Sequence, residues 1–294
     1  MANPLHLPGP HFLAFYVFVA LVVLVGLWLI RGATEGGPIP RIDTSDPFLI
    51  ADLRGGPNEA LRVAAVSLID RGLLVVDESE RTLKTKPDAT TLRPIEQALQ
   101  RKFAQARPAT DIFDDFDLKV ACFAYEDTLT RLGLLPDDDM QRSRRRRLGI
   151  AIAIFLGVAA LKIYVALERG RTNVMFLIVL AFVACFVAFR LSSARRTARG
   201  DALLGDLRRL FRRLRDRAAT IRPGGVTAEA ALLAAVFGLG ALTASGFAFV
   251  RRLYPRAASG GGSSCGSSCG AACGSSCGGG SGGGCGGCGG GGSS

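Results

Sequence analysis

The chain has 294 residues, and 49% of them are hydrophobic. These residues gather into runs of about twenty, the length that crosses a bilayer core, which excludes an ordinary soluble globular protein. Lys and Arg outnumber Asp and Glu by 36 to 25, and residues 190–256, with 14 basic and 4 acidic side chains, hold most of the excess. Because His6 and His11 are the only histidines, most histidine-based catalysis and histidine-rich metal sites are excluded too.

The first apolar run predicts a transmembrane helix over residues 12–30. The run has no charged residue, and residues 1–11 before it contain neither Lys nor Arg. A cleaved signal peptide would need a basic start, a shorter apolar core and a small-residue cleavage site. We therefore expect a retained helix that follows a short external N-terminus.

Two further runs, 148–167 and 174–191, predict a transmembrane hairpin, since only a short turn over residues 168–173 separates them. Arginines gather before the first run and after the second: Arg142, Arg144, Arg145, Arg146, Arg147, Arg190, Arg195, Arg196 and Arg199. Basic residues that flank membrane spans stay on the cytoplasmic side. Residues 32–147 are therefore expected in the cytoplasm.

Residues 32–147 carry nearly balanced charge and predict a small α+β domain. Pro57 begins a helix that Gly72 ends, and residues 73–77 and 81–85 alternate as a β-hairpin. This order is typical of the second half of a winged helix. Two more helices are expected, one from Pro94 to Arg107 and one after a cap at Thr110–Asp111.

The last of these helices ends in a sequence that repeats the end of the first one. Leu132-Gly133-Leu134 echoes Arg71-Gly72-Leu73, which indicates two similar helix-then-wing units, the second truncated. A nucleic-acid-binding domain would need a basic recognition helix, but the helix over residues 58–71 is neutral. We expect a domain that contacts protein, and no nucleic acid.

Residues 201–217 predict a basic amphipathic helix, with leucines on one face and arginines on the other. Such a helix beside a membrane span is suited to anionic headgroups. In the alternative, its leucines pack on the domain and its arginines are only solvated. The membrane-contacting residues would be Arg208, Arg209, Arg212, Arg213, Arg215 and Arg217.

Residues 230–250 form an uncharged apolar run that predicts one more helix. The run is long enough to be a fourth span, but three arginines follow it closely, against the usual charge rule. Small residues at helical spacing suit close packing in lipid and equally suit a re-entrant or protein-buried helix. The sequence leaves both readings open.

Residues 259–294 consist almost wholly of Gly, Ser, Cys and Ala, a low-complexity composition typical of a disordered tail. Three readings compete for its thiols: binding of zinc or Cu(I), disulfide formation in an oxidising compartment, and no defined ligand. The tail could also be a substrate for cysteine modification. The metal-ligand candidates are Cys265, Cys269, Cys273, Cys277, Cys285 and Cys288.

The sequence contains no phosphate-binding, zinc-protease or nucleophile-elbow motif, so we expect neither an enzyme nor a bound cofactor. Short motifs occur in a recognisable order: Leu53-Arg54-Gly55-Gly56, Arg71-Gly72-Leu73, the central hairpin, Phe237-Gly238-Leu239 and the tail. In these the chain resembles a family of uncharacterised bacterial membrane proteins with a Gly/Ser/Cys-rich C-terminus. The resemblance implies location and architecture only.

Taken together, the sequence predicts a mainly α, multi-pass protein of the bacterial inner membrane. It would have three or four transmembrane helices, a winged-helix-like cytoplasmic domain and a disordered tail. The expected function is that of a non-enzymatic membrane-anchored scaffold or interaction protein, with the bilayer and an unknown protein as partners. The alternative is metal or thiol-redox handling through the tail cysteines.

Overall fold

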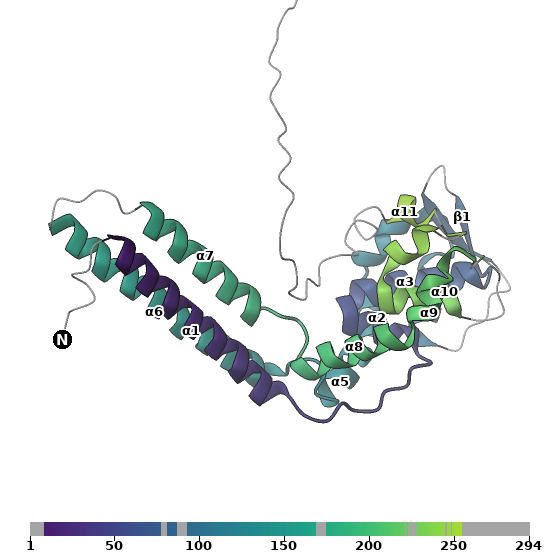
Figure 1. Cartoon of the computed structure of the whole chain (residues 1–294). Helices are drawn as coiled ribbons and strands as arrows, with labels where there is room; N and C mark the ends of the chain where they lie inside the picture. The colour runs from purple at the N-terminus through teal and green to yellow at the C-terminus, as the bar shows by residue number, and fades with distance from the viewer. Residues whose placement is uncertain are drawn as a thin grey trace, which may run out of the picture. The chain divides into compact units, whose positions relative to one another are not determined.

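The computed structural model describes residues 9–77, 81–86, 93–168, 175–220, 222, 224, 228–244, 246–247 and 249–254. Over these residues the chain is mostly helical, with a small antiparallel sheet. Three long helices lie side by side, and shorter helices and the sheet gather round a hydrophobic core of their own (Figure 1).

The long helices are α1 (Gly9–Glu35), α6 (Asp138–Glu168) and α7 (Met175–Ser192). Each is long and apolar enough to cross a membrane, over Leu13–Glu35, Asp138–Val165 and Met175–Ser192. The three predicted spans are thereby confirmed as helices of this kind, and they indicate a membrane protein. The second begins ten residues before the apolar run, because arginine is a good helix former and the acidic Asp138 and Asp139 suit a helix N-terminus.

Small side chains let the three helices approach one another closely. Ala20 of α1, Ala151 of α6 and Ala184 and Ala188 of α7 are buried together. The hydroxyl of Tyr16 donates a hydrogen bond across to the carbonyl oxygen of Phe155, at 3.2 Å. The large apolar side chains that point outward, Phe18, Trp28 and Phe182 among them, are suited to lipid.

The domain is built round α3. This helix (Pro57–Asp70) contacts α2 (Pro47–Gly55), α4 (Pro94–Lys102), α5 (Phe116–Arg131) and α10 (Glu229–Phe237). The other elements are α8 (Ala198–Leu210), α9 (Arg212–Asp216), α11 (Val250–Leu253) and three short 3₁₀ helices, η2 (Ala109–Phe113), η3 (Ala218–Thr220) and η4 (Leu239–Ala244). Between Ala60 and Asp70 every residue of α3 except Arg62 is buried.

The predicted hairpin is confirmed as β1 (Leu74–Asp77) paired antiparallel with β2 (Thr82–Thr85), with Leu74 opposite Thr85. A third strand that the sequence did not predict, β3 (Arg107–Pro108), pairs with β2. The helix expected to reach Arg107 stops five residues earlier, because Phe103 turns into the core.

The helix expected to start at Thr110–Asp111 starts later than predicted. The chain first makes η2, and the side chain of Asp115 then caps α5 by accepting a hydrogen bond from the Leu118 amide at 3.2 Å. The prediction placed the cap at the wrong aspartate because several acidic residues here have cap-like spacing.

The sequence likeness around Gly72 and Gly133 reflects the same C-terminal cap on two helices. Both glycines have φ near +70°, and the following leucine amide bonds back to the carbonyl five residues earlier: Leu73 to Leu68 and Leu134 to Leu129, both at 2.9 Å. After Gly72 the chain forms β1, whereas after Gly133 it leads into α6. The likeness therefore covers the end of each helix and not a second wing.

The prediction of one continuous apolar helix over residues 230–250 was wrong. The segment forms α10, η4 and the start of α11, none of which is long enough to span a bilayer. The break falls at Gly238, whose φ is +94° and whose amide closes α10 onto Ala234 at 2.9 Å. Ala230, Leu233 and Val236 are fully buried in the domain, with α10 packed on α2 and α3.

The predicted amphipathic helix is also interrupted, since α8 ends at Leu210 and α9 begins at Arg212. Leu203, Leu204, Leu207 and Leu214 are buried in the domain core. Most of its leucine face is therefore used within the protein, while Leu210 is 68% exposed.

Candidate functional site

A buried ion pair joins two of the membrane helices, α1 and α6, at their domain end. Glu35 at the end of α1 is 2% exposed, and Arg144 of α6 is 7% exposed. Arg144 donates from Nε to Glu35 Oε1 at 2.7 Å and from Nη2 to Oε2 at 2.6 Å. This two-point geometry is the strongest that a guanidinium and a carboxylate can form.

The same arginine also holds the segment between α7 and α8. Arg144 donates hydrogen bonds to the carbonyl oxygens of Ala194 and Arg196. Two more of its donors thus bond to the backbone, which partly offsets the cost of taking its charge out of water.

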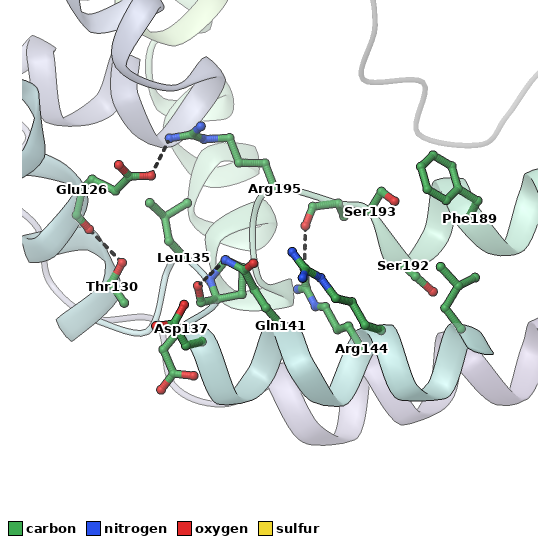
Figure 2. A pocket seen from close by; sticks show the side chains of 15 residues that line it. Glu126, Thr130, Leu135, Asp137, Gln141, Arg144, Phe189, Ser192, Ser193 and Arg195 are labelled. Atoms are coloured by element: carbon green, nitrogen blue, oxygen red, sulfur yellow. Dashed lines mark hydrogen bonds and ion pairs between the residues drawn. The ribbon is translucent and has the colours of Figure 1, made fainter. Parts of the chain in front are cut away.

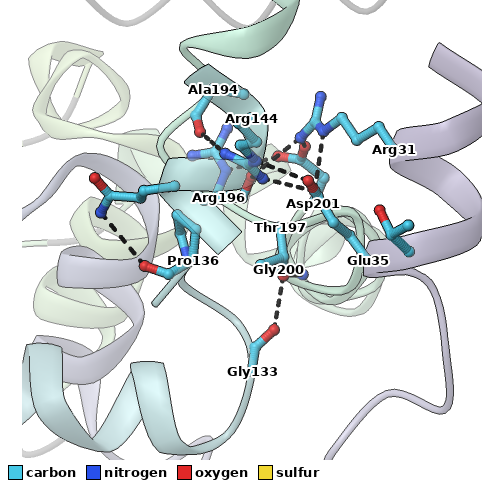
Figure 3. A network of polar contacts seen from close by, with 12 residues as sticks. Arg31, Glu35, Gly133, Pro136, Arg144, Ala194, Arg196, Thr197, Gly200 and Asp201 are labelled. Atoms are coloured by element: carbon cyan, nitrogen blue, oxygen red, sulfur yellow. Dashed lines mark hydrogen bonds and ion pairs between the residues drawn. The ribbon is translucent and has the colours of Figure 1, made fainter. Parts of the chain in front are cut away.

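Three further ion pairs extend the junction to α8, as Figure 3 shows. Arg31 bonds to Glu35 at 3.2 Å and to Asp201 at 2.8 Å, and Arg196 bonds to the other oxygen of Asp201 at 2.7 Å. One connected set of charges therefore joins α1, α6 and α8.

Thr197 fixes the start of α8 to the end of α5. Its hydroxyl caps α8 at the Gly200 amide and lies 2.8 Å from the Gly133 carbonyl oxygen, while its amide donates to the Leu134 carbonyl oxygen at 3.1 Å. Gly200 has no room for a side chain, since a Cβ there would lie 2.5 Å from the Leu134 carbonyl oxygen. The helix ending at Gly133 thus supplies a docking point for α8.

A buried carboxylate lies on the domain side of the junction. Asp52 of α2 is fully buried, and Arg195 lies 3.3 Å from its Oδ1 and 3.4 Å from Glu126 of α5. Burial raises the pKa of Asp52 to about 6, which the charge of Arg195 partly opposes. Burial likewise raises the pKa of the nearby Cys122 thiol to about 12, so this cysteine is an unreactive packed residue.

A cavity of about 680 Å³ opens where α5, α6 and the α7–α8 segment meet. Its polar lining includes Glu126, Asp137, Asp138, Arg145 and Arg195, and its apolar lining includes Leu148 and Phe189 (Figure 2). Charged groups of both signs therefore lie next to the start of the apolar run of α6 and the end of α7.

An apolar stripe on α5 is the second surface feature. Phe116 is 75% exposed and Phe123 is 67% exposed, with Val120 between them also exposed. The spacing of four and three residues puts all three on one face of the helix. We call this set, Phe116, Val120 and Phe123, the α5 stripe.

The arginines predicted to meet headgroups follow one another along α8 and α9. Arg209, Arg212, Arg213, Arg215 and Arg217 are exposed, and Arg208 is half-buried. Burial and neighbouring arginines lower the pKa of Arg208, while Arg215 stacks over the Phe237 ring at 5.4 Å. The structure keeps these charges on the surface, and Leu210 is the one leucine of residues 201–217 that is exposed beside them.

The six tail cysteines proposed as metal ligands lie outside the described residues. Within the described part of the chain, no group of three or more His, Cys, Asp or Glu side chains is arranged to hold a metal ion. Metal or redox handling by the tail therefore stays a prediction from the sequence.

Comparison with protein-family models, with characterised proteins and with solved structures finds no match to this chain. Its class follows from the fold: a membrane protein with three apolar helices and a mainly helical domain, in which the buried Glu35–Arg144 pair joins α1 to α6 and the partly exposed Arg31–Asp201 pair joins α1 to α8. Sequence reasoning missed this junction. The one available signal was an acidic residue, Glu35, directly after an apolar run and ahead of an arginine cluster.

Proposed function

We propose that the chain is a non-enzymatic membrane-anchored interaction protein whose domain binds a protein partner through the α5 stripe. The exposure of two phenylalanines and a valine on one helix face is the observation that carries this proposal. Large apolar side chains gathered on a surface are typical of docking sites. Their spacing is that of helix-to-helix recognition.

The charges beside the stripe define the chemistry of that partner. Asp114 and Asp117 are exposed next to Phe116, and neither has an ion-pair partner among the described residues. An amphipathic helix with an apolar face and basic flanks complements this surface, since opposite charges steer association.

The burial of α3 supports a protein partner over a nucleic acid. In a winged-helix-like domain, α3 would be the helix before the wing, and β1 and β2 would be the wing. Here α3 is enclosed by α2, α4, α5 and α10, so it has no free face to enter a groove. Its first turn carries Glu59, which is paired with both Arg54 and Arg62, and this leaves little unpaired positive charge for phosphate.

The proposed location is the bacterial inner membrane, with residues 32–147 in the cytoplasm. The arginines at the start of α6 and after the end of α7 support this orientation. On that side the exposed arginines of α8 and α9 would face anionic headgroups. Because Leu203, Leu204, Leu207 and Leu214 are buried and only Leu210 is exposed, that attraction would be mainly electrostatic and would weaken as salt rises.

The test is site-specific photocrosslinking in the full-length protein in bacterial cells. A photoreactive phenylalanine replaces Phe123, and in a matched control it replaces Val75, an exposed apolar residue of β1. We expect a specific protein adduct at position 123 and none at position 75. The crosslinked protein is identified by mass spectrometry, purified and tested for direct binding.

Binding of the purified partner to the purified wild-type chain and its variants decides the outcome. The double variant Phe116→Ser and Phe123→Ser should weaken binding of the identified partner by about 100-fold or more, the size expected for two central apolar anchors. Asp117→Lys should weaken the binding further, because the proposed partner helix has basic flanks. Equal crosslinking at positions 123 and 75, or unchanged binding of the double variant, would refute the proposal.

A further inference from the structure

The junction cavity is lined by one face of α6 whose chemistry changes in order along the helix. Asp138, Gln141, Arg145 and Leu148 all line it, at spacings of three, four and three residues that keep them on one face. Asp138 lies farthest from the apolar run, Arg145 lies about 10 Å nearer to it, and Leu148 begins it. The sequence along this face is thus anion, amide, cation and hydrocarbon.

Two of the charges in this cavity are available to a ligand. Among the described residues Arg145 and Asp138 are exposed and have no ion-pair or hydrogen-bond partner. The neighbouring charges are engaged: Arg144 bonds to Glu35 and two carbonyls, Arg195 is paired with Glu126, and Asp137 accepts a hydrogen bond from the Met140 amide at 2.9 Å. Among the described residues, the cavity therefore offers one free cation, Arg145, and one free carboxylate, Asp138, with the capping carboxylate of Asp137 beside it.

We propose that this cavity binds a single phospholipid whose headgroup carries a phosphate and a primary ammonium, as an ethanolamine phospholipid does. Such a lipid presents its groups in the matching order: acyl chains in the hydrocarbon, then the phosphate, then the ammonium farthest out. Arg145 pairs with the phosphate and Asp138 with the ammonium, while Leu148 and Phe189 contact the start of the acyl chains. This site is distinct from the α5 stripe and does not depend on the partner proposed there.

The same charges disfavour the other common headgroups. A glycerol headgroup has no cation for Asp138, which would leave a carboxylate beside an anionic lipid. A choline headgroup carries a cation without an N–H, so it forms no charge-assisted hydrogen bond with Asp138.

The experiment is native mass spectrometry of the detergent-purified full-length chain titrated with dioleoyl phosphatidylethanolamine, phosphatidylglycerol or phosphatidylcholine. Four variants accompany the wild type: Arg145→Gln and Asp138→Asn in the cavity, with Arg146→Gln and Asp139→Asn as controls. Each control removes the same charge one residue further along α6, at a position outside the cavity lining. It therefore reproduces any effect that the lost charge has on the helix end or on membrane orientation.

We expect the ethanolamine lipid to bind about ten-fold more tightly than the other two, the size of one charge-assisted hydrogen bond. Asp138→Asn should remove that preference, because the ethanolamine lipid loses its ammonium partner and the glycerol lipid no longer meets a carboxylate. Arg145→Gln should weaken all three, while Arg146→Gln and Asp139→Asn should behave as the wild type does. Equal affinity for the three lipids, or equal effects of Asp138→Asn and Asp139→Asn, would overturn the proposal.

A soluble headgroup separates a lipid from a free phosphate compound as the source of the ligand. Glycerophosphoethanolamine carries the phosphate and the ammonium without acyl chains. Binding of this compound at least about ten-fold weaker than that of the lipid supports a lipid site, because contacts with Leu148 and Phe189 would be missing. Equal affinity would assign the cavity to a soluble ligand and overturn the lipid assignment.

Discussion

Glu35 and Arg144 hold opposite charges in a site with almost no access to water. A pair of this kind adds little net stability over an apolar pair, but removal of one partner leaves the other charge buried and uncompensated. The pair also fixes a geometry, since Arg144 has to reach Glu35, Ala194 and Arg196 together.

Arg144→Gln should lower the free energy of unfolding by about 3–5 kcal/mol, because Glu35 would lose its buried partner. Glu35→Gln should have a similar effect. The double variant should lose less free energy of unfolding than the sum of the two single losses. Denaturant titration of the detergent-purified chain measures this. Arg142→Gln is the control: its pair with Asp139 is exposed, and its loss should cost under about 1 kcal/mol. Equal losses for Arg142→Gln and Arg144→Gln would contradict the assignment.

The element that most clearly depends on its neighbours is α10. It is apolar on every side and buried on α2 and α3, and its C-terminal end receives a hydrogen bond from Arg54 Nε to the Ala235 carbonyl oxygen at 2.8 Å. Gly238 ends the helix at a positive φ, at a point where a Cβ would lie 2.9 Å from the Arg54 guanidinium. The turn therefore needs glycine for two reasons.

Gly238→Ala should destabilise the domain by about 1–2 kcal/mol, because alanine is strained at this φ and would also displace Arg54. The matched variant is Gly205→Ala within α8, where the space around a Cβ is open. That change should stabilise the protein by about 0.5–1 kcal/mol, since alanine is the better helix former. Thermal unfolding followed by circular dichroism would compare them, and a shift of the same sign in both variants would contradict this explanation.

Local patterns in the sequence predicted the elements well and their long-range partners poorly. The three apolar runs, the β1–β2 hairpin and the glycine ends at Gly72 and Gly133 depend on neighbouring residues, so spacing alone revealed them. The Glu35–Arg144 pair joins positions 109 residues apart, and no local pattern encodes such a contact. The strand β3 is two residues long and exists because β2 offers it a partner.

The same limit explains why the sequence left the surroundings of residues 230–250 open. Hydropathy reports that a segment avoids water but does not distinguish a bilayer from a protein core. The segment lies inside the domain because α2 and α3 present an apolar surface to it. The cavity and the α5 stripe likewise depend on which faces the fold leaves open, which the sequence alone did not reveal.

At the scale of the whole molecule, the burial of α10 and α11 in the domain predicts the compartment of the tail. A chain that leaves the domain at Tyr254, with no span after Ser192 among the described residues, should carry the tail on the domain's side of the membrane. With the domain in the cytoplasm, an impermeant thiol reagent should fail to label the tail cysteines in intact cells and should label them after lysis. The variant with all six tail cysteines changed to serine reports the background from Cys122 and Cys185. Labelling in intact cells would contradict the prediction.

The domain core is made from two stretches of chain, residues 47–135 and 198–254, with the α6–α7 hairpin between them. During synthesis, α2 and α3 therefore leave the ribosome without the helix that covers them. At typical elongation rates of 5–20 residues per second, the wait for α10 lasts on the order of 10 s. During this wait the nascent protein exposes the apolar surface of α2 and α3, while the α6–α7 hairpin has already been synthesised and can enter the bilayer. Membrane insertion thus comes before completion of the fold, and a slow or failed insertion would leave the half-built domain open to aggregation.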